Sequence, residues 1–363
     1  MEKKPLLSIA IPTYNRAAHL QDLLRQIAPY AYQSQGLVEI CISSNGSTDH
    51  TRQMVANFQQ EYPQVITYHE HKTNLGFDRN VLKVIEISRG DYIWTFGDDD
   101  SFANDGLAAV VNLLKTLDQK TTGVVVARMD LYFTDVTTNQ KVFYGSFLSN
   151  DTVGMSFGDA GSMTPLIFNS YFLKRIISEE SEMIEQAVGI VFMHVVLRSL
   201  MLLRYPQLQA VMMNRPVIFM VVNPCKFFVE DKFLLNYQGQ KKLNRMLLGY
   251  QYMDSKHTAT ITKNNAMLRW GFTMNMVMMR IFNGLNCFSY PGALRLFFTQ
   301  ANVADALLFA SVFLTLSLTP RSILIWLYQL LLMKRYGKQW KQRWFLIRNF
   351  NAMMGQGTRR QPT

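Results

Sequence analysis

The stretch YIWTFGDDDSF, residues 92–102, runs from an apolar segment with the composition of a buried strand directly into three aspartates. Neighbouring carboxylates repel one another, so Asp98, Asp99 and Asp100 need either solvent or a cation around them. Aspartate is a common turn residue, and a solvated turn is one interpretation. The other is a metal site, because oxygen ligands suit Mg²⁺ and Mn²⁺. The context of the stretch decides between the two.

The residues up to 128 alternate short apolar runs with segments of helical spacing. In one of these segments Leu20, Leu23, Leu24 and Ile27 fall on a single helical face. Strands are predicted over residues 6–11, 37–43, 65–69, 91–96 and 123–128, and helices over 18–28, 47–62, 77–88 and 104–117. This alternation predicts an α/β fold of βαβ units, with a mostly parallel sheet flanked by helices.

Polar segments follow the first, second and fourth predicted strands: PTYNR, SNGSTD and GDDDS. In parallel sheets, ligands bind beyond the carboxyl ends of the strands. We therefore expect the three segments to meet at one edge of the sheet. This meeting favours a binding site over a solvated turn.

The positive charge of the chain is concentrated in its last part. Of 37 Lys and Arg residues, 14 follow Asp254, but only one of the 26 acids, Asp305, does so. A basic segment of this kind implies an anionic partner. The three cysteines, Cys41, Cys225 and Cys287, are far apart, and they indicate neither a disulfide framework nor a zinc site.

Apolar runs in the basic segment indicate which partner it has. The runs over residues 306–318 and 322–333 are each shorter than the roughly 20 residues that span a bilayer. Residues 334–344, KRYGKQWKQRW, mix basic and aromatic side chains, as interfacial helices do. We expect a monotopic or re-entrant contact with an anionic membrane surface, and the alternative is a buried helical subdomain. Nucleic acid is not expected, because the adjoining runs are too apolar.

Four blocks occur in order over residues 8–101: SIAIPTYNR, EICISSNGSTDHT, NLGFDRN and GDYIWTFGDDDS. Together they resemble the nucleotide-binding half of family 2 glycosyltransferases, which have a Rossmann-like GT-A fold. Within that family they are most similar to the abequosyltransferase-like branch of bacterial O-antigen and surface-polysaccharide enzymes. The resemblance implies inverting transfer from a nucleotide-sugar donor, with a divalent metal, Mn²⁺ or Mg²⁺, as cofactor.

The resemblance also implies roles for the matching residues. Donor-binding residues would be Pro12, Thr13, Tyr14, Asn15, Ser44, Arg79 and Asp98. Gly97 stands where many relatives have the first aspartate of a DxD motif. Asp99 then aligns with the metal ligand and Asp98 with the ribose contact. Asp100 would be a second metal ligand or a contact to the donor sugar.

A second departure from the family concerns the nucleotide base. Relatives that use uridine donors often carry an aspartate just before the Asn of NGSTD, whereas this chain has Ser43 and Ser44. A hydroxyl can donate a hydrogen bond to cytosine N3. We hypothesise that Ser44 permits a CDP-linked donor, and the alternative is that Ser44 only shapes its loop.

Inverting transfer needs a general base that deprotonates the acceptor hydroxyl. The family usually supplies an acid near the start of a helix in the second half of the chain. The helix predicted over residues 188–203 has no carboxylate there, but His194 is close to the expected position. Glu185 is the nearest upstream carboxylate. A lone histidine on an apolar helix is more often structural, so both candidates stay open.

The expected organisation has three parts. Residues 1–128 would be the nucleotide-sugar-binding half of a GT-A domain, 129–255 the acceptor-binding half, and 256–363 a helical membrane-associated region. The enzyme would act at the cytoplasmic face of a bacterial inner membrane on a saccharide linked to undecaprenyl diphosphate. One alternative is a membrane-bound scaffold with a degenerate site. Another is a nucleotidyltransferase, which would need a Gly-rich loop in place of PTYNR.

Overall fold

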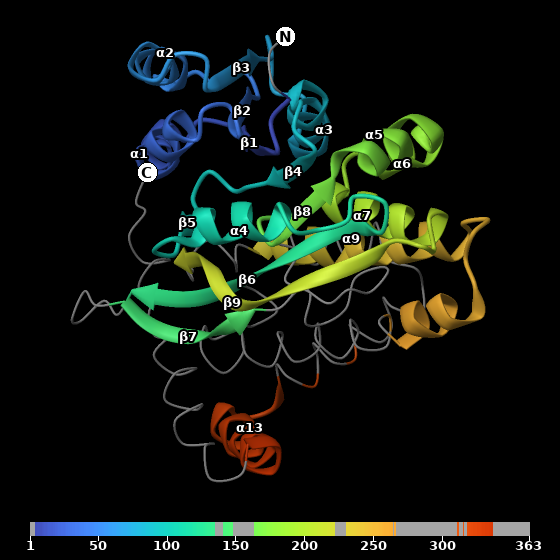
Figure 1. Cartoon of the computed structure of the whole chain (residues 1–363). Helices are drawn as coiled ribbons and strands as arrows, with labels where there is room; N and C mark the ends of the chain where they lie inside the picture. The colour runs from blue at the N-terminus through green and yellow to red at the C-terminus, as the bar shows by residue number, and fades with distance from the viewer. Residues whose placement is uncertain are drawn as a thin grey trace. The chain divides into compact units, whose positions relative to one another are not determined.

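The computed structural model describes residues 4–134, 141–147, 163–221, 230–263, 265, 311, 315 and 318–336 (Figure 1). The chain divides into two compact units. The first contains Met1–Leu131, Gly145–Met220 and Gly239–Asn264, and the second contains Tyr132–Tyr144, Val221–Gln238 and Asn265–Thr363. The candidate site lies wholly within the first unit. The three-part organisation expected from the sequence stays a prediction.

The strands are β1 Leu7–Thr13, β2 Val38–Ser44, β3 Ile66–Glu70, β4 Tyr92–Thr95, β5 Ser101–Phe102, β6 Thr122–Thr134, β7 Lys141–Phe147, β8 Leu166–Asn169 and β9 Gln209–Val221. In the described part of the chain these nine strands form one sheet in the order β3-β2-β1-β4-β8-β6-β9-β5, with β7 paired to β6. The first four strands in this order are parallel to one another. The sheet is mixed, because β8 pairs antiparallel with both β4 and β6.

The five predicted strands are present, but the fifth does not continue the parallel order. The segment predicted over residues 123–128 lies in β6 and is separated from β4 by β8. The four residues of β8 are all buried. They come from far along the chain, and no alternation within the first 128 residues could have revealed their insertion.

The helices are α1 Ala17–Gln33, α2 Thr51–Glu61, α3 Phe77–Ile87, α4 Gly106–Leu114, α5 Ser170–Glu179, α6 Ser181–Ala187, α7 Met193–Arg204, α9 Glu230–Leu248 and α13 Arg321–Tyr336. The four helices predicted in the first 128 residues are confirmed, with shifted ends. The first runs five residues further than expected because Pro29 is accommodated inside it.

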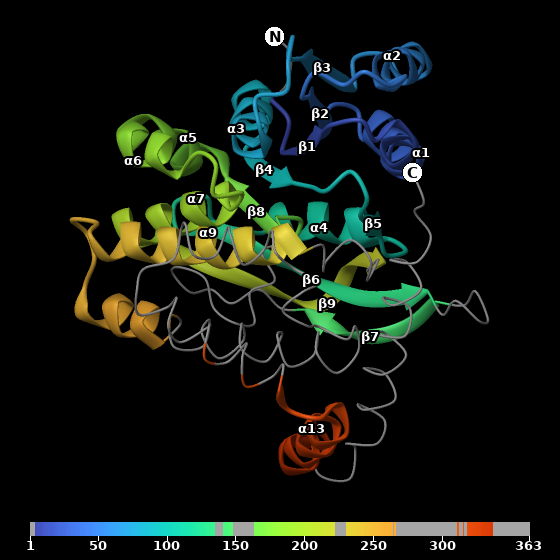
Figure 2. The ribbon, with the colours of Figure 1, turned by 180° about the vertical axis from the view of Figure 1, so that it is seen from behind.

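Both faces of the parallel strands are covered by helices. Successive side chains of a strand point to opposite faces, so Ala10 and Cys41 join one core cluster with Val84 of α3. Ile9 of β1 joins the other cluster with Leu24 of α1. Figures 1 and 2 show α1 and α2 on one side of β1 to β3 and α3 on the other. Burial on both faces explains the continuous apolar composition of these strands.

The helix predicted over residues 188–203 is wrong in its first part. α6 ends at Ala187 and α7 begins at Met193. Between them Gly189 has φ 92° and Val191 has φ 64°, which no right-handed helix contains. The carboxylate of Asp78 accepts hydrogen bonds from the backbone N–H groups of both residues. Asp78 on α3 therefore accepts hydrogen bonds from N–H groups that, in a continuous helix, would donate to backbone carbonyls of the same helix.

In the second unit α13 is an apolar helix with basic residues towards its end. None of the helices that the structure describes is both long and apolar enough to cross a bilayer. Most of the apolar run 306–318 and of the basic-aromatic segment 334–344 lies outside the described residues.

Candidate active site

A pocket of about 510 Å³ opens at the carboxyl ends of β1, β2 and β4. It is lined by the segment after β1, the segment after β4, the start of α3 and the residues just before β8. The predicted meeting of PTYNR and GDDDS at one edge is thus observed. From SNGSTD, Asn45 lines the pocket.

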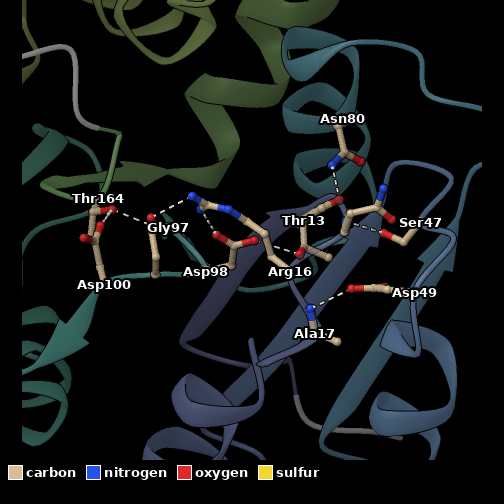
Figure 3. A network of polar contacts seen from close by, with 12 residues as sticks. Thr13, Arg16, Ala17, Ser47, Asp49, Asn80, Gly97, Asp98, Asp100 and Thr164 are labelled. Atoms are coloured by element: carbon tan, nitrogen blue, oxygen red, sulfur yellow. Dashed lines mark hydrogen bonds and ion pairs between the residues drawn. The ribbon is translucent and has the colours of Figure 1, made fainter. Parts of the chain in front are cut away.

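Arg16 lies against two of the three aspartates. Its Nη1 is 2.6 Å from Asp98 Oδ1, and its Nη2 is 2.9 Å from Asp99 Oδ2. The Thr13 hydroxyl donates to the second oxygen of Asp98 at 2.7 Å (Figure 3). Both oxygens of Asp98 are therefore occupied, and its side chain is only 5% exposed. The side chain of Asp99 is 40% exposed.

Asp100 is held by a different partner. Its buried carboxylate accepts a hydrogen bond from Thr164, and the Thr164 hydroxyl in turn accepts one from the Gly97 N–H at 3.0 Å (Figure 3). Burial raises the pKa of Asp100 to about 7; the Thr164 hydrogen bond opposes the rise, and the charges of Asp99 and Asp98 add to it. Burial also raises the pKa of Asp98, against the opposing effects of Arg16 and Thr13.

The packing around Gly97 leaves little room for a side chain there. A Cβ at this position would lie 2.8 Å from Asp100 Oδ2 and 3.2 Å from Thr164 Oγ1. The first distance is shorter than real Cβ contacts, so a side chain at residue 97 would displace Asp100 or Thr164. The arrangement of these two residues thus depends on the glycine.

The acidic segment fits a divalent ion in its chemistry but not in its present arrangement. Carboxylate oxygens suit Mg²⁺ and Mn²⁺. However, nowhere in the described ranges do three or more His, Cys, Asp or Glu side chains converge as a metal site would require. Asp99, with Asp98 beside it, would hold an ion once Arg16 has moved. Asp100, which bonds to Thr164, is less suited to the ligand role predicted for it.

The loop after β1 is joined to the loop after β2. Asn15 has φ 51° and accepts the Thr48 N–H at 2.7 Å, while its own N–H donates to Ser47 Oγ at 3.0 Å. Ser44 is buried and donates to Ser47 Oγ at 2.9 Å. Neither Asn15 nor Ser44 lines the pocket as described, whereas Tyr14 does and is 42% exposed. The placement of Ser44 agrees with the loop-shaping alternative.

Asp49 fixes the starts of two helices beside the pocket. Its carboxylate accepts the Ala17 N–H at 3.0 Å, at the start of α1, and the Thr51 N–H at 3.1 Å, at the start of α2. Partial burial raises the pKa of Asp49, but the hydrogen bonds from Thr51 and Ala17 outweigh burial and leave the pKa below its ordinary value. The segment that carries Arg16 is positioned in this way.

Asparagine side chains connect the end of β2 to the loop before α3 and to α3 itself, which line the rest of the pocket. Asn45 donates to Asn74 Oδ1 at 2.8 Å and to the Gly76 carbonyl at 3.1 Å. Gly76 has φ 88°, which favours glycine, so Asn74 and Gly76 shape the loop before α3. The buried Asn80 donates to the Ser43 carbonyl at 2.9 Å and ties α3 to β2.

Three other predicted residues lie outside the lining of this pocket. Arg79 and Glu185 form an ion pair with 2.5 Å between Nη2 and Oε1. Arg79 lines a separate pocket with Lys83 and Lys174. His194 is 1% exposed within α7. The roles of Arg79 at the donor and of His194 or Glu185 as base stay predictions, which this placement does not support.

Among the pocket residues to which sequence reasoning gave no role are Arg16, Asn45, Asn80 and Thr164. The first three lie inside the quoted blocks, so their polar side chains at strand and helix ends were a usable signal. Thr164 lies in no motif, and only the insertion of β8 brings it to Gly97 and Asp100.

Comparison with known proteins relates the first part of the chain to a family. The family described as glycosyl transferase family 2 matches residues 8–171. Abequosyltransferase RfbV of Salmonella typhimurium is 40% identical over 124 residues, which are 32% of this chain and 37% of that protein. The chain thus matches little more than a third of that relative's length.

Two solved structures share the fold over nearly the whole chain. The fragment TarS 1-349 of S. aureus has a TM-score of 0.53 at 12% identity, and the match covers 98% of this chain and 92% of that fragment. The mannosyltransferase PcManGT from Pyrobaculum calidifontis, solved in complex with GDP-Man and Mn²⁺, has a TM-score of 0.50 at 13% identity, with 99% and 88% covered. At such identities the likeness shows the fold, which is the α/β GT-A fold. Residues 8–171, which are less than half of the chain, match glycosyltransferase family 2.

Proposed function

We propose that the chain transfers a sugar, with inversion, from a nucleotide diphosphate donor to a lipid-linked saccharide in the assembly of a bacterial surface polysaccharide. The observation that carries this proposal is the pocket that joins the exposed Tyr14 to the pair Asp98 and Asp99. An aromatic face suits a nucleotide base, against which it can stack. The acidic pair suits a metal-bound diphosphate.

The cofactor in this proposal is Mn²⁺ or Mg²⁺, held chiefly by the exposed carboxylate of Asp99, with the charge of Asp98 beside it. The mannosyltransferase of the same fold was solved with both GDP-Man and Mn²⁺, which supports the choice. When bound, such an ion would stabilise the negative charge of the departing diphosphate. Thr13 would keep Asp98 oriented, since it already donates to that carboxylate.

The acceptor in this proposal is a saccharide on undecaprenyl diphosphate, reached at the cytoplasmic face of the inner membrane. The partial identity with an abequosyltransferase supports O-antigen chemistry. The excess of basic residues after Asp254 supports an anionic surface as partner. On α13, Trp326 is 59% and Leu327 45% exposed, which suits an interfacial helix.

A binding and transfer screen tests the proposal. CDP, UDP and GDP would be titrated calorimetrically with and without Mn²⁺, and the matching nucleotide sugars offered with a lipid-linked acceptor extracted from membranes. We expect metal-dependent binding of one nucleotide and transfer from its sugar. A clear preference for UDP would contradict the CDP hypothesis. Binding without transfer or hydrolysis would indicate a scaffold, and pyrophosphate release from a nucleoside triphosphate would indicate nucleotidyl transfer.

A further inference from the structure

Arg16 is a charged side chain of the pocket that the proposed chemistry does not yet use. It precedes α1 directly and is about one-third exposed. One guanidinium nitrogen contacts Asp98 and another contacts Asp99, so a single cation bridges the two carboxylates. The bridge engages one oxygen of each carboxylate, and these are oxygens that an ion would need as ligands.

Electrostatics make Arg16 and a divalent ion competitors for the same oxygens. Two cations within a few ångströms repel one another strongly in a part-buried site. An ion can therefore bind both carboxylates only after the guanidinium has left at least one of them. A nucleoside diphosphate would give the guanidinium a new partner, because its planar fork matches phosphate oxygens.

The two ion pairs of Arg16 differ in how readily they break. Asp98 is 5% exposed and also held by Thr13, so separating it from Arg16 would leave a buried charge without its partner. Asp99 is 40% exposed, and ion pairs at such positions contribute little to stability. Of the two contacts, the one with Asp99 therefore costs less to break.

We propose that Arg16 is a positioning residue that exchanges partners when ligands bind. Without ligand it neutralises Asp98 and Asp99. When a nucleoside diphosphate and a divalent ion enter, the guanidinium leaves Asp99 for the diphosphate and the ion takes its place. The identity of the anion rests on the proposed function, whereas the competition with a divalent ion rests on the two ion pairs alone.

Replacing Arg16 should change the affinities for the two ligands in opposite directions. In Arg16→Gln, we expect Mn²⁺ without nucleotide to bind about ten-fold more tightly, because a competing charge has gone. The metal-free affinity for a nucleoside diphosphate should fall about ten-fold, because its cation has gone. Mn²⁺ would be followed by electron paramagnetic resonance and the nucleotide by calorimetry in chelator, neither of which depends on catalytic activity.

Arg25→Gln is the matched control, since Arg25 lies on α1 in an exposed pair with Asp22. It should leave both affinities unchanged. Should Arg16→Gln fail to fold, Arg16→Lys retains the charge without the fork, and it should show the same opposite changes at smaller size. A folded variant that binds Mn²⁺ no more tightly than the wild type would overturn the proposal. Failure of every form to bind any nucleoside diphosphate would instead overturn the proposed function, and the Mn²⁺ titration would still decide the role of Arg16.

Discussion

The carboxylate of Asp78 accepts a hydrogen bond from the backbone N–H of Gly189 at 2.8 Å, although the two residues are 111 positions apart. The same carboxylate accepts the N–H groups of Val191 and Met193 at 2.9 and 3.2 Å. One buried side chain at the start of α3 thus fixes the segment between α6 and α7. Asp78 thereby connects α3, which borders the pocket, to the segment between α6 and α7.

Replacing Asp78 by Asn tests this connection. The amide has a similar shape but offers one acceptor oxygen, and its NH₂ group would face N–H donors. Leaving buried N–H groups without acceptors costs about 1–3 kcal/mol, so we expect the free energy of unfolding to fall by about 2 kcal/mol. Urea unfolding measures the change, and Asp22→Asn on the exposed side of α1 is the control. Equal midpoints for the two variants would mean that Asp78 does not hold the segment.

Most of the parallel part of the sheet could be predicted from the sequence, because the pattern that marks each strand or helix lies within that element. Each strand and helix carries its own periodicity, and polar segments mark the strand ends. The interruption at residues 188–192 was only partly marked in the sequence. Gly189, with φ 92°, is a usual signal for a helix end, but the partner that holds the break, Asp78, lies on another element. The insertion of β8 beside β4 was hidden for the same reason.

In the site, the motifs likewise predicted which segments come together but not which side chains contact one another. The loop after β1 and the aspartates after β4 come together as predicted. The roles inside the site depend on neighbours, which a motif does not contain. Arg79 forms an ion pair with Glu185 and does not line this pocket. Ser44 points its hydroxyl to Ser47, and Asp100 bonds to Thr164.

Asp99→Asn should abolish the metal-dependent part of donor binding. Asp99 is the carboxylate that the pocket exposes, and an amide is a much weaker ligand for a hard cation. We expect Mn²⁺ to strengthen nucleotide binding in the wild type at least about ten-fold, that is by about 1.4 kcal/mol, and not at all in the variant. Calorimetric titration with and without Mn²⁺ measures this, with Asp91→Asn, at the far end of β4, as control. If Mn²⁺ strengthened nucleotide binding in Asp99→Asn as much as in the wild type, the aspartates would be better interpreted as a solvated turn.

Arg79→Gln and Glu185→Gln should leave nucleotide affinity within about two-fold of the wild type. Their side chains are 44% and 62% exposed, and an ion pair at that exposure contributes about 0–1 kcal/mol to stability. The pocket beside Asp98 does not include either residue. Calorimetry with the preferred nucleotide diphosphate checks the expectation. A ten-fold loss confined to Arg79→Gln would restore the donor contact inferred from the family, and lost transfer confined to Glu185→Gln would restore Glu185 as base.

His194→Ala should weaken the fold more than it weakens the chemistry. His194 is buried within α7, and truncating a large side chain inside a core costs about 2–4 kcal/mol. Since His194 does not line the pocket, we expect the folded variant to keep most of its transfer rate. Thermal unfolding and kcat measured well below the midpoint separate the two effects. A fall in kcat of a hundred-fold or more, at a temperature where the variant is folded, would reinstate His194 as the base.

Asp49→Ala should destabilise the domain in a way that depends on pH. The carboxylate caps two helix starts, and loss of a cap costs about 1–2 kcal/mol. Because the pKa of Asp49 is lowered in the folded chain, the native state favours the ionised form. The contribution of Asp49 to stability is therefore fully present above the ordinary aspartate pKa of about 4, and it is lost as the pH falls through the lower, folded-state pKa.

Urea unfolding at neutral pH and near pH 3 measures this effect. The difference in free energy of unfolding between the wild type and Asp49→Ala should narrow in acid. Asp49→Asn, which keeps an acceptor oxygen but no titratable group, should lose less stability at neutral pH. Its difference from the wild type should also narrow in acid, because only the wild type titrates at residue 49. A difference for Asp49→Ala that persists unchanged in acid would mean that the charge of Asp49 does not contribute to holding α1 and α2.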